Sequence, residues 1–259
     1  MKFKIIILMI SFIALQSCVP YKNIVYLQGD LPQTNVDSTS YKIKKDDILY
    51  ISIKSSNESI ERLFKAQLNS NISNQHSSQS LYFSGYTVDK NGEIELPVIN
   101  KIKVEGYTFE DVKRLIKQKL LENQFKSLEE IYIKVKLAGV PYTVIGEVKT
   151  PKNGILYKTN PNIFDVLSDA KDITPVGNRK EVVVIRKEND KLVKKTLNLT
   201  DADIVTSPYF YTRPNDIIYI KPLRQKTWGT GTTLQQTIST TITALSLFTT
   251  IILLSKYAN

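Results

Sequence analysis

Few residues of this chain have the type and spacing that catalysis on a substrate requires. The chain contains one histidine, His76, and one cysteine, Cys18, so neither a histidine-based triad nor a site with several histidine ligands can be assembled. Adjacent carboxylates such as Glu129 and Glu130 could serve a glycosidase, but nothing in the sequence places them across a cleft. We therefore expect no catalytic residues and no metal site, which leaves Cys18 as the reactive position.

Cys18 stands at the end of a pattern typical of an export signal. Lys2 and Lys4 precede an apolar run over residues 5–15, which is too short for a stable membrane span. The run closes on Leu-Gln-Ser-Cys at residues 15–18, which resembles the lipobox of bacterial lipoproteins, where the cysteine is diacylglyceryl-modified and becomes the first residue after cleavage. We expect a signal peptide over residues 1–17 and no cofactor other than diacylglycerol and N-acyl lipid on Cys18. The alternative is a buried free thiol behind an ordinary secretory signal.

Composition and charge limit the class of protein further. Without residues 1–17 the chain carries 33 basic and 25 acidic side chains, a formal charge of +8. Basic proteins can bind nucleic acid, but export removes that partner, so the lysines indicate a solvated surface with a weak preference for anionic lipids or acidic glycans. With no second cysteine, stability must come from apolar cores, and 242 residues suffice for two small domains. Residues 19–22 contain no acidic cluster, which by resemblance to lipoprotein sorting rules favours the periplasmic face of the outer membrane.

A first folded domain is predicted over residues 41–138, after a lipidated tether over residues 18–40. Apolar residues alternate over residues 49–53, which indicates a strand. Residues 55–80 are rich in Ser, Asn and Gln and indicate a flexible surface insertion that contains His76.

The rest of this domain is a hairpin, a helix and a strand. Asn91 and Gly92 stand between alternating segments and predict a hairpin turn, because both turn positions need positive φ. Thr108 is the expected N-cap of a helix, and residues 130–137 alternate as a closing strand. The apolar face of the helix consists of Val112, Leu115, Ile116 and Leu120.

A second domain is predicted over residues 139–224. Apolar residues alternate over residues 142–148, and Asn153 with Gly154 predicts a turn. Asn160 and Pro161 are expected to cap a helix over residues 163–170. Three further strands are expected at residues 181–186, 191–199 and 217–221. Mixed strands around single helices predict an α+β fold with two small domains, followed by a C-terminal helix.

One short pattern occurs in both domains. Residues 45–51 read Lys-Asp-Asp-Ile-Leu-Tyr-Ile and residues 214–220 read Pro-Asn-Asp-Ile-Ile-Tyr-Ile. In each copy a residue that tolerates left-handed backbone geometry precedes an aspartate whose carboxylate can accept hydrogen bonds from backbone amides. The pattern predicts structural turns, and the turn residues are Asp46, Asp47, Asn215 and Asp216.

Together the two domains resemble the polysaccharide export outer-membrane lipoproteins. The resemblance to the polysaccharide export domain lies in Tyr41-x-Ile43-x-x-Asp46-Asp47-Ile48-Leu49, in residues 86–97 and in Val-Glu-Gly-Tyr-Thr at 104–108. Residues 142–148 and 213–216 resemble a soluble-ligand-binding β-grasp (SLBB) domain. The family's Pro-Gly-Asp turn is altered at both places, Lys171 and Asp172 replace its Gly-Gly pair, and only one β-grasp domain fits the length.

Residues 225–259 have the composition of a transmembrane helix. The 29 residues from 227 to 255 carry no charge, and Trp228 and Tyr257 stand where interfacial aromatic anchors are expected. A helix over residues 232–255 would be about 36 Å long, enough for a hydrocarbon core of about 30 Å. Spacings of three and four place polar residues on one stripe: Gln236, Ser239, Thr243, Ser246 and Thr250. Apolar residues lie away from that stripe: Leu234, Ile238, Ile242, Leu245 and Ile252.

The resemblance implies a function for this helix. In the family, one such helix from each of several identical subunits, eight by resemblance, forms an α-helical barrel through the outer membrane. The polar stripe would then line a hydrated lumen for capsule or exopolysaccharide, and the apolar side would meet lipid. The alternative for the stripe is ordinary packing of small hydroxyl residues between membrane helices. The family also implies an inner-membrane polysaccharide copolymerase or tyrosine autokinase as partner, and no nucleic acid.

Two other classes of protein stay open. A non-conducting periplasmic glycan-binding lipoprotein would have the same domains, and its helix would stay monomeric in detergent. An envelope hydrolase would show turnover that mutation of one carboxylate abolishes.

Overall fold

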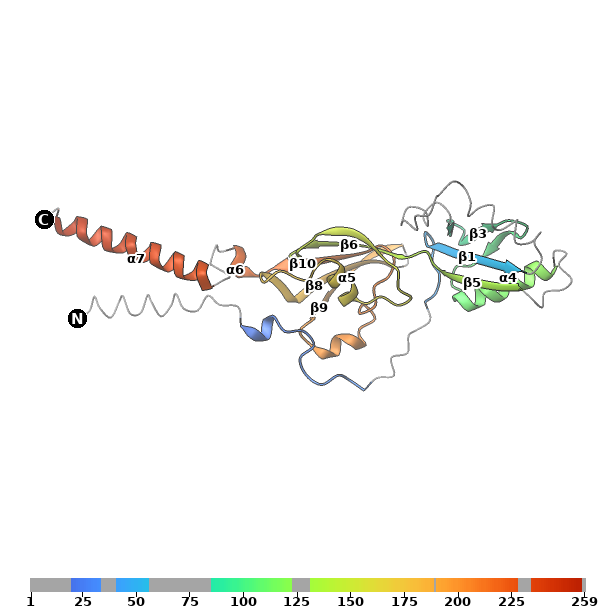
Figure 1. Ribbon diagram of the computed structural model, residues 1–259, viewed down its shortest axis with the longest axis horizontal. Coiled ribbons are helices and arrows are strands. Elements are labelled where there is room, and N and C mark those ends of the chain that lie inside the picture. The colour runs from blue at the N-terminus through green and yellow to red at the C-terminus, as the bar shows by residue number, and fades with distance from the viewer. Residues whose placement is uncertain are drawn as a thin grey trace.

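The computed structural model describes residues 20–33, 41–55, 85–122, 131–188, 190–227 and 234–257. It contains two sheet-bearing units in line and a long helix at one end (Figure 1). The described strands form three small sheets, which confirms the predicted mixed α+β class. The predicted lipidation site Cys18, the anchor Trp228 and residues 56–80 of the predicted insertion lie outside the described residues.

The first unit is a three-stranded sheet covered by a helix. Strand β1 (Ile48–Ser55) pairs antiparallel with both β2 (Tyr86–Thr87) and β5 (Ile131–Leu137), so it is the central strand. Helix α4 (Phe109–Glu122) buries three side chains against this sheet: Val112, Ile116 and Leu120. A hairpin of β3 (Glu93–Leu96) and β4 (Asn100–Lys103) completes the same apolar core.

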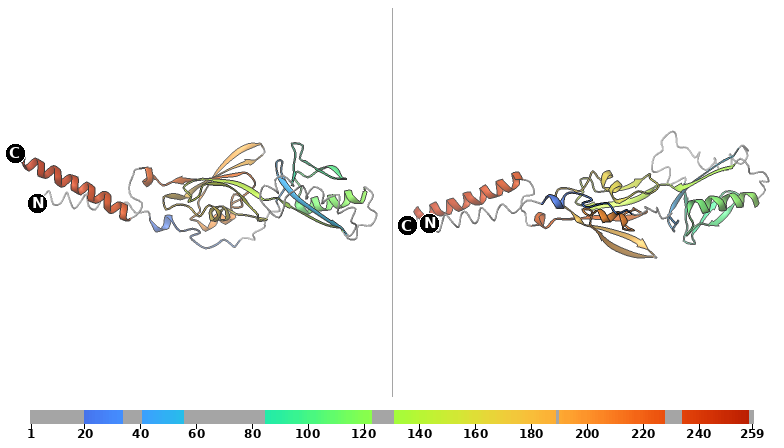
Figure 2. Two further views of the ribbon diagram at one scale, coloured as in Figure 1. Left: turned by 45° about the horizontal axis from the view of Figure 1, so that its top comes forward. Right: turned by 90° about the horizontal axis from the view of Figure 1, so that it is seen from below.

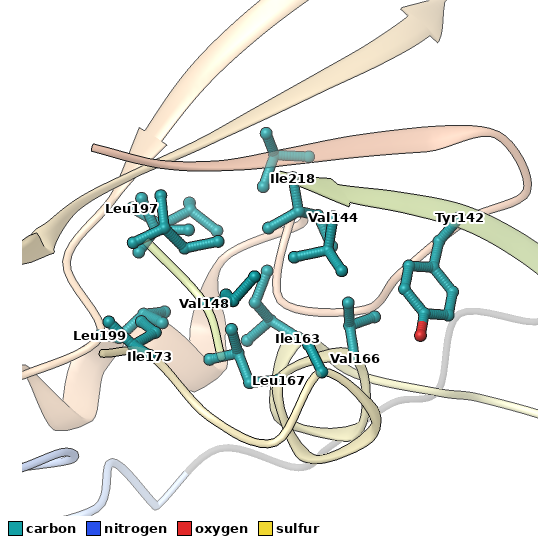
Figure 3. Packing of buried hydrophobic residues seen from close by; sticks show 14 of the residues in the cluster. Tyr142, Val144, Val148, Ile163, Val166, Leu167, Ile173, Leu197, Leu199 and Ile218 are labelled. Atoms are coloured by element: carbon teal, nitrogen blue, oxygen red, sulfur yellow. The ribbon is translucent and has the colours of Figure 1, made fainter. Parts of the chain in front are cut away.

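The second unit is a five-stranded mixed sheet in the order β7-β6-β10-β8-β9. Its strands are β6 (Val140–Gly146), β7 (Lys152–Leu156), β8 (Gly177–Glu188), β9 (Lys191–Leu197) and β10 (Asp216–Pro222). The pair β6 and β10 is parallel, and the other pairs are antiparallel. Helix α5 (Ile163–Asp169) packs Ile163, Val166 and Leu167 against apolar side chains of the sheet (Figure 3).

Two turn predictions are wrong, for reasons of packing and capping. Asn153 and Gly154 lie inside β7, where they pair with β6. A Cβ on Gly154 would lie 2.5 Å from the Tyr142 hydroxyl, so glycine at this position makes room for the tyrosine side chain and does not mark a turn. The cap of α5 is Asn162 rather than Asn160, and the Asn162 side chain accepts hydrogen bonds from the N–H groups of two residues in the first turn.

The turn predicted at Asn91 and Gly92 is present, but the segments on its two sides do not pair as a hairpin. Gly92 has a φ of +76°, and the Asp89 carboxylate accepts hydrogen bonds from the N–H groups of Asn91 and Glu93. The segments that this turn joins belong to different sheets, because β2 pairs with β1 and β3 pairs with β4. A tight turn therefore links two layers of the unit instead of closing one hairpin.

The N-terminal segment docks on the second unit. After the short helix η2 (Tyr21–Asn23), the N–H groups of Leu27 and Gln28 donate hydrogen bonds to the carbonyl groups of Leu199 and Thr200. The Tyr26 hydroxyl donates to the Asp172 carboxylate at 2.5 Å. This part of the predicted tether is thus held against the second unit before the chain enters the first unit.

The chain ends in two helices, α6 (Arg224–Thr227) and α7 (Leu234–Tyr257). The length of α7, 24 residues, agrees with the helix predicted over residues 232–255. Within the described part of the chain, no helix combines the length and the apolar character that crossing a membrane requires. The transmembrane role of residues 225–259 therefore stays a prediction.

Candidate membrane-facing site

The predicted polar stripe of α7 is built from hydroxyl side chains that bond to the helix itself. The Thr243 hydroxyl donates to the Ser239 carbonyl at 2.9 Å, and the Ser246 hydroxyl donates to the Thr243 carbonyl at 2.9 Å. The Thr250 hydroxyl donates to the Ser246 carbonyl at 2.8 Å, and Thr249, which is outside the predicted stripe, donates to the same carbonyl at 2.9 Å. Each hydroxyl thereby satisfies its donor internally and keeps lone pairs for water. The side chain of the remaining stripe residue, Gln236, is outside the described part of the structure.

Large apolar side chains on α7 are exposed in the single chain. Ile238, Ile242 and Leu245, predicted to face lipid, are all exposed, and Ile242 reaches 62% exposure. Sequence reasoning missed three more exposed leucines: Leu247, Leu253 and Leu254. The side chains of Leu234 and Ile252 are not among those described. An apolar surface of this extent marks a membrane or a protein partner.

The polar stripe ends before the helix does. Ser239, Thr243, Ser246 and Thr250 follow one another at helical spacing, and the next positions on that line are the exposed Leu253 and Leu254. The described stripe is therefore about 17 Å long at roughly 1.5 Å per residue. Beyond it comes Tyr257, the predicted interfacial anchor, which is exposed and ends α7.

Both chain ends attach to the same end of the second sheet. Figures 1 and 2 show η2, the blue helix, and α6 near the end of the second sheet from which α7 departs. The Leu223 N–H donates to the Val176 carbonyl at 2.7 Å, and Lys226 forms an ion pair with Glu147 at 2.5 Å. Burial and the hydrogen bond to Asp172 raise the pKa of the Tyr26 hydroxyl, which stays protonated and donates. Residues that follow Cys18 and residues that precede α7 are thus held close together.

The four predicted turn residues occupy two equivalent turns. Asp46 and Asn215 both have left-handed backbones, with φ of +69° and +65°. In the first turn the Asp47 carboxylate accepts from the Lys44 N–H at 2.8 Å, and in the second the Asp216 carboxylate accepts from the Arg213 N–H at 2.8 Å. These carboxylates stabilise turns by hydrogen bonding three residues back along the chain.

The family comparison concerns the first unit. Residues 35–138 match a family model for polysaccharide biosynthesis/export proteins. That stretch of the chain is a polysaccharide export domain, and the family is one of transport proteins and not of enzymes. No curated protein matches the chain. The match ends at residue 138, so the β-grasp assignment of residues 139–224 stays a prediction.

Proposed function

We propose that this protein is a subunit of an outer-membrane channel that exports capsule or exopolysaccharide. The observation that carries the proposal is the combination of a polysaccharide export domain with α7, a long helix on which six large aliphatic side chains are exposed. Transport of a hydrophilic polymer needs a hydrated passage, and α7 is the element whose polar and apolar sides suit the wall of such a passage.

The proposed channel wall is a ring of α7 helices from identical subunits. A single helix encloses no pore, and exposed hydroxyl and apolar side chains on one helix call for water on one side and lipid on the other. A helix that lines a lumen needs a fully apolar surface only where it faces lipid. At roughly 1.5 Å per residue the 24 residues of α7 span about 36 Å, which exceeds the hydrocarbon thickness of about 30 Å.

The anchoring of both ends supports the same arrangement. In this proposal Cys18 carries diacylglycerol and an N-acyl chain, which together give stable attachment to the inner leaflet of the outer membrane. The docked segment after Cys18 keeps that lipid near the origin of α7, so lipid and helix enter one membrane. The first unit then points into the periplasm, where an inner-membrane copolymerase or autokinase would deliver the polysaccharide.

Paired cysteine variants test the two faces of α7. Ser246→Cys lies on the polar stripe, and Leu245→Cys is its matched control on the apolar side, both made with lipidated Cys18 intact. A membrane-impermeant maleimide should label Ser246→Cys at least about tenfold faster in outer-membrane vesicles, because thiolates form in water and are suppressed in lipid. Equal labelling of both positions would contradict a hydrated stripe.

A further inference from the structure

Residues of both units line a cleft. Figure 1 shows where the units join, as β5 runs into β6. Residues from the start of the first unit and from the turn before β10 line a cavity of about 380 Å³, within the range of small-ligand sites. Tyr41 and Tyr211 contribute aromatic rings to its wall, and Asn160 contributes an exposed amide. Three cations, Lys42, Lys44 and Arg213, line it, and the described lining residues include no carboxylate.

Positive charge in this cleft is only partly compensated. Burial, followed by the neighbouring Arg213 charge, lowers the pKa of Lys44. The nearest partner of Arg213 is Glu188, at 3.9 Å, and the Lys44 ammonium has no ion-pair partner within the described residues. Asp47, the other nearby carboxylate, is occupied by the Tyr41 hydroxyl and the Lys44 N–H. Glu188 and Asp47 compensate this positive charge only in part, so an anion that enters the cleft would gain further electrostatic attraction.

Thr212 adds an unused hydrogen-bonding group. Its side chain is 6% exposed, and its hydroxyl has no hydrogen-bond partner in the described structure, although its N–H donates to the Pro161 carbonyl at 2.8 Å. An unpaired buried hydroxyl is costly, so such groups mark places where a ligand or water completes the bonding. Thr212 is one of the residues that line the same cavity as Lys44 and Arg213, and its hydroxyl lies buried in that wall.

We propose that this cleft binds an acidic saccharide unit, a sugar ring that carries a carboxylate. The carboxylate would accept hydrogen bonds from Lys44 and Arg213, sugar hydroxyls would pair with Thr212 and Asn160, and the rings of Tyr41 and Tyr211 would contact the apolar faces of the sugar. A bare inorganic anion would use the cations and leave the aromatic rings unused. The saccharide identity of the ligand rests on the proposed export function, and its negative charge rests on the cleft alone.

The test is calorimetric titration of full-length, detergent-extracted protein with tetragalacturonate, its uncharged galactotetraose counterpart and inorganic phosphate. We expect binding of tetragalacturonate that weakens with salt, with at least about tenfold weaker binding of the other two probes. Lys44→Met should weaken tetragalacturonate binding at least about tenfold, and Lys195→Met, which removes an exposed lysine on β9 outside the cleft, should change it less than twofold. Thermal midpoints by circular dichroism confirm that each variant is folded.

Thr212→Val separates binding from stability. Removing an unpaired hydroxyl should leave the thermal midpoint unchanged or raised, while weakening tetragalacturonate binding by about fivefold. Absent binding, unaltered binding in Lys44→Met and Thr212→Val, or equal affinity for phosphate would each overturn the proposal. Failure to form rings would contradict the export function and leave a measured acidic-saccharide site standing, so the two failures can be told apart.

Discussion

Arg186 and Asp216 form a buried ion pair beneath the second of the two equivalent turns. The guanidinium donates to both carboxylate oxygens, at 2.8 and 2.7 Å, and also to the carbonyl groups of Pro208 and Tyr211. Its central carbon lies 4.6 Å from the centre of the Tyr209 ring. Removing one partner of such a pair leaves a buried charge without compensation.

Arg186→Met should therefore destabilise the second unit strongly. We expect a loss of about 3–5 kcal/mol in the free energy of unfolding, measured by urea denaturation. The control is Lys221→Met, which breaks the exposed ion pair with Glu181 and should cost less than about 1 kcal/mol. Equal losses in both variants would show that burial does not set the strength of the pair.

Asp47, in the first turn, predicts a pH dependence of stability. Burial raises the pKa of this carboxyl group to about 6 from an ordinary value of 3.8. Between these two pH values the folded state holds a proton on Asp47 that the unfolded state has lost. The free energy of unfolding therefore falls as the pH rises from 3.8 to about 6, and the decrease is complete above pH 6. Asp47→Asn should remove up to about 3 kcal/mol of that fall, seen as a flatter unfolding free energy between pH 4 and 7. Parallel pH profiles for the two proteins would contradict this.

At the scale of elements, the cap of α5 gives a sharp prediction. The Asn162 side chain accepts from the N–H groups of Phe164 and Asp165, while the Asp165 carboxylate accepts from the Asn162 N–H at 2.8 Å. Asn162→Ala should cost about 1 kcal/mol of stability, measured by thermal unfolding. Asn160→Ala, at the cap position expected from the sequence, should cost less than about 0.5 kcal/mol. The reverse order would mean that the helix begins at Pro161.

Elements set by local patterns could be predicted from the sequence, and elements set by contacts between distant segments could not. Period-two alternation found the buried positions of β1, and helical spacing found the buried face of α4, because both patterns are local. The turn predicted at Asn153 and Gly154 was wrong because the glycine makes room for the Tyr142 side chain on a neighbouring strand. A local sequence pattern cannot reveal a contact between strands. The parallel pairing of β6 with β10 joins segments about 70 residues apart, and no local pattern encodes it.

The parts of the candidate site that lie on one helix could be predicted from the sequence, and the parts that join distant segments could not. The hydroxyl stripe of α7 follows from spacing along one helix, and so was visible in the sequence. The docking of Tyr26 on Asp172 joins residues 146 positions apart, so an irregular polar tether was all that composition could indicate. The cleft between the units likewise needs Tyr41 and Thr212 to be brought together by the fold.

At the scale of the whole molecule, the end that carries α7 is separated from the end that carries the polysaccharide export domain. The N-terminal segment and α6 meet at one end of the second sheet, and the polysaccharide export domain lies at the other end of the molecule (Figure 2). In the proposed ring, every subunit would therefore direct its helix the same way. That common direction is what an α-helical barrel through the outer membrane requires.

Electron microscopy of the full-length protein extracted in detergent tests this ring most directly. We expect rings with a central cavity and a narrow stem, and loss of the stem, with the wider body retained, when residues 228–259 are removed. Monodisperse monomers of the full-length protein would contradict the ring and favour a non-conducting glycan-binding lipoprotein.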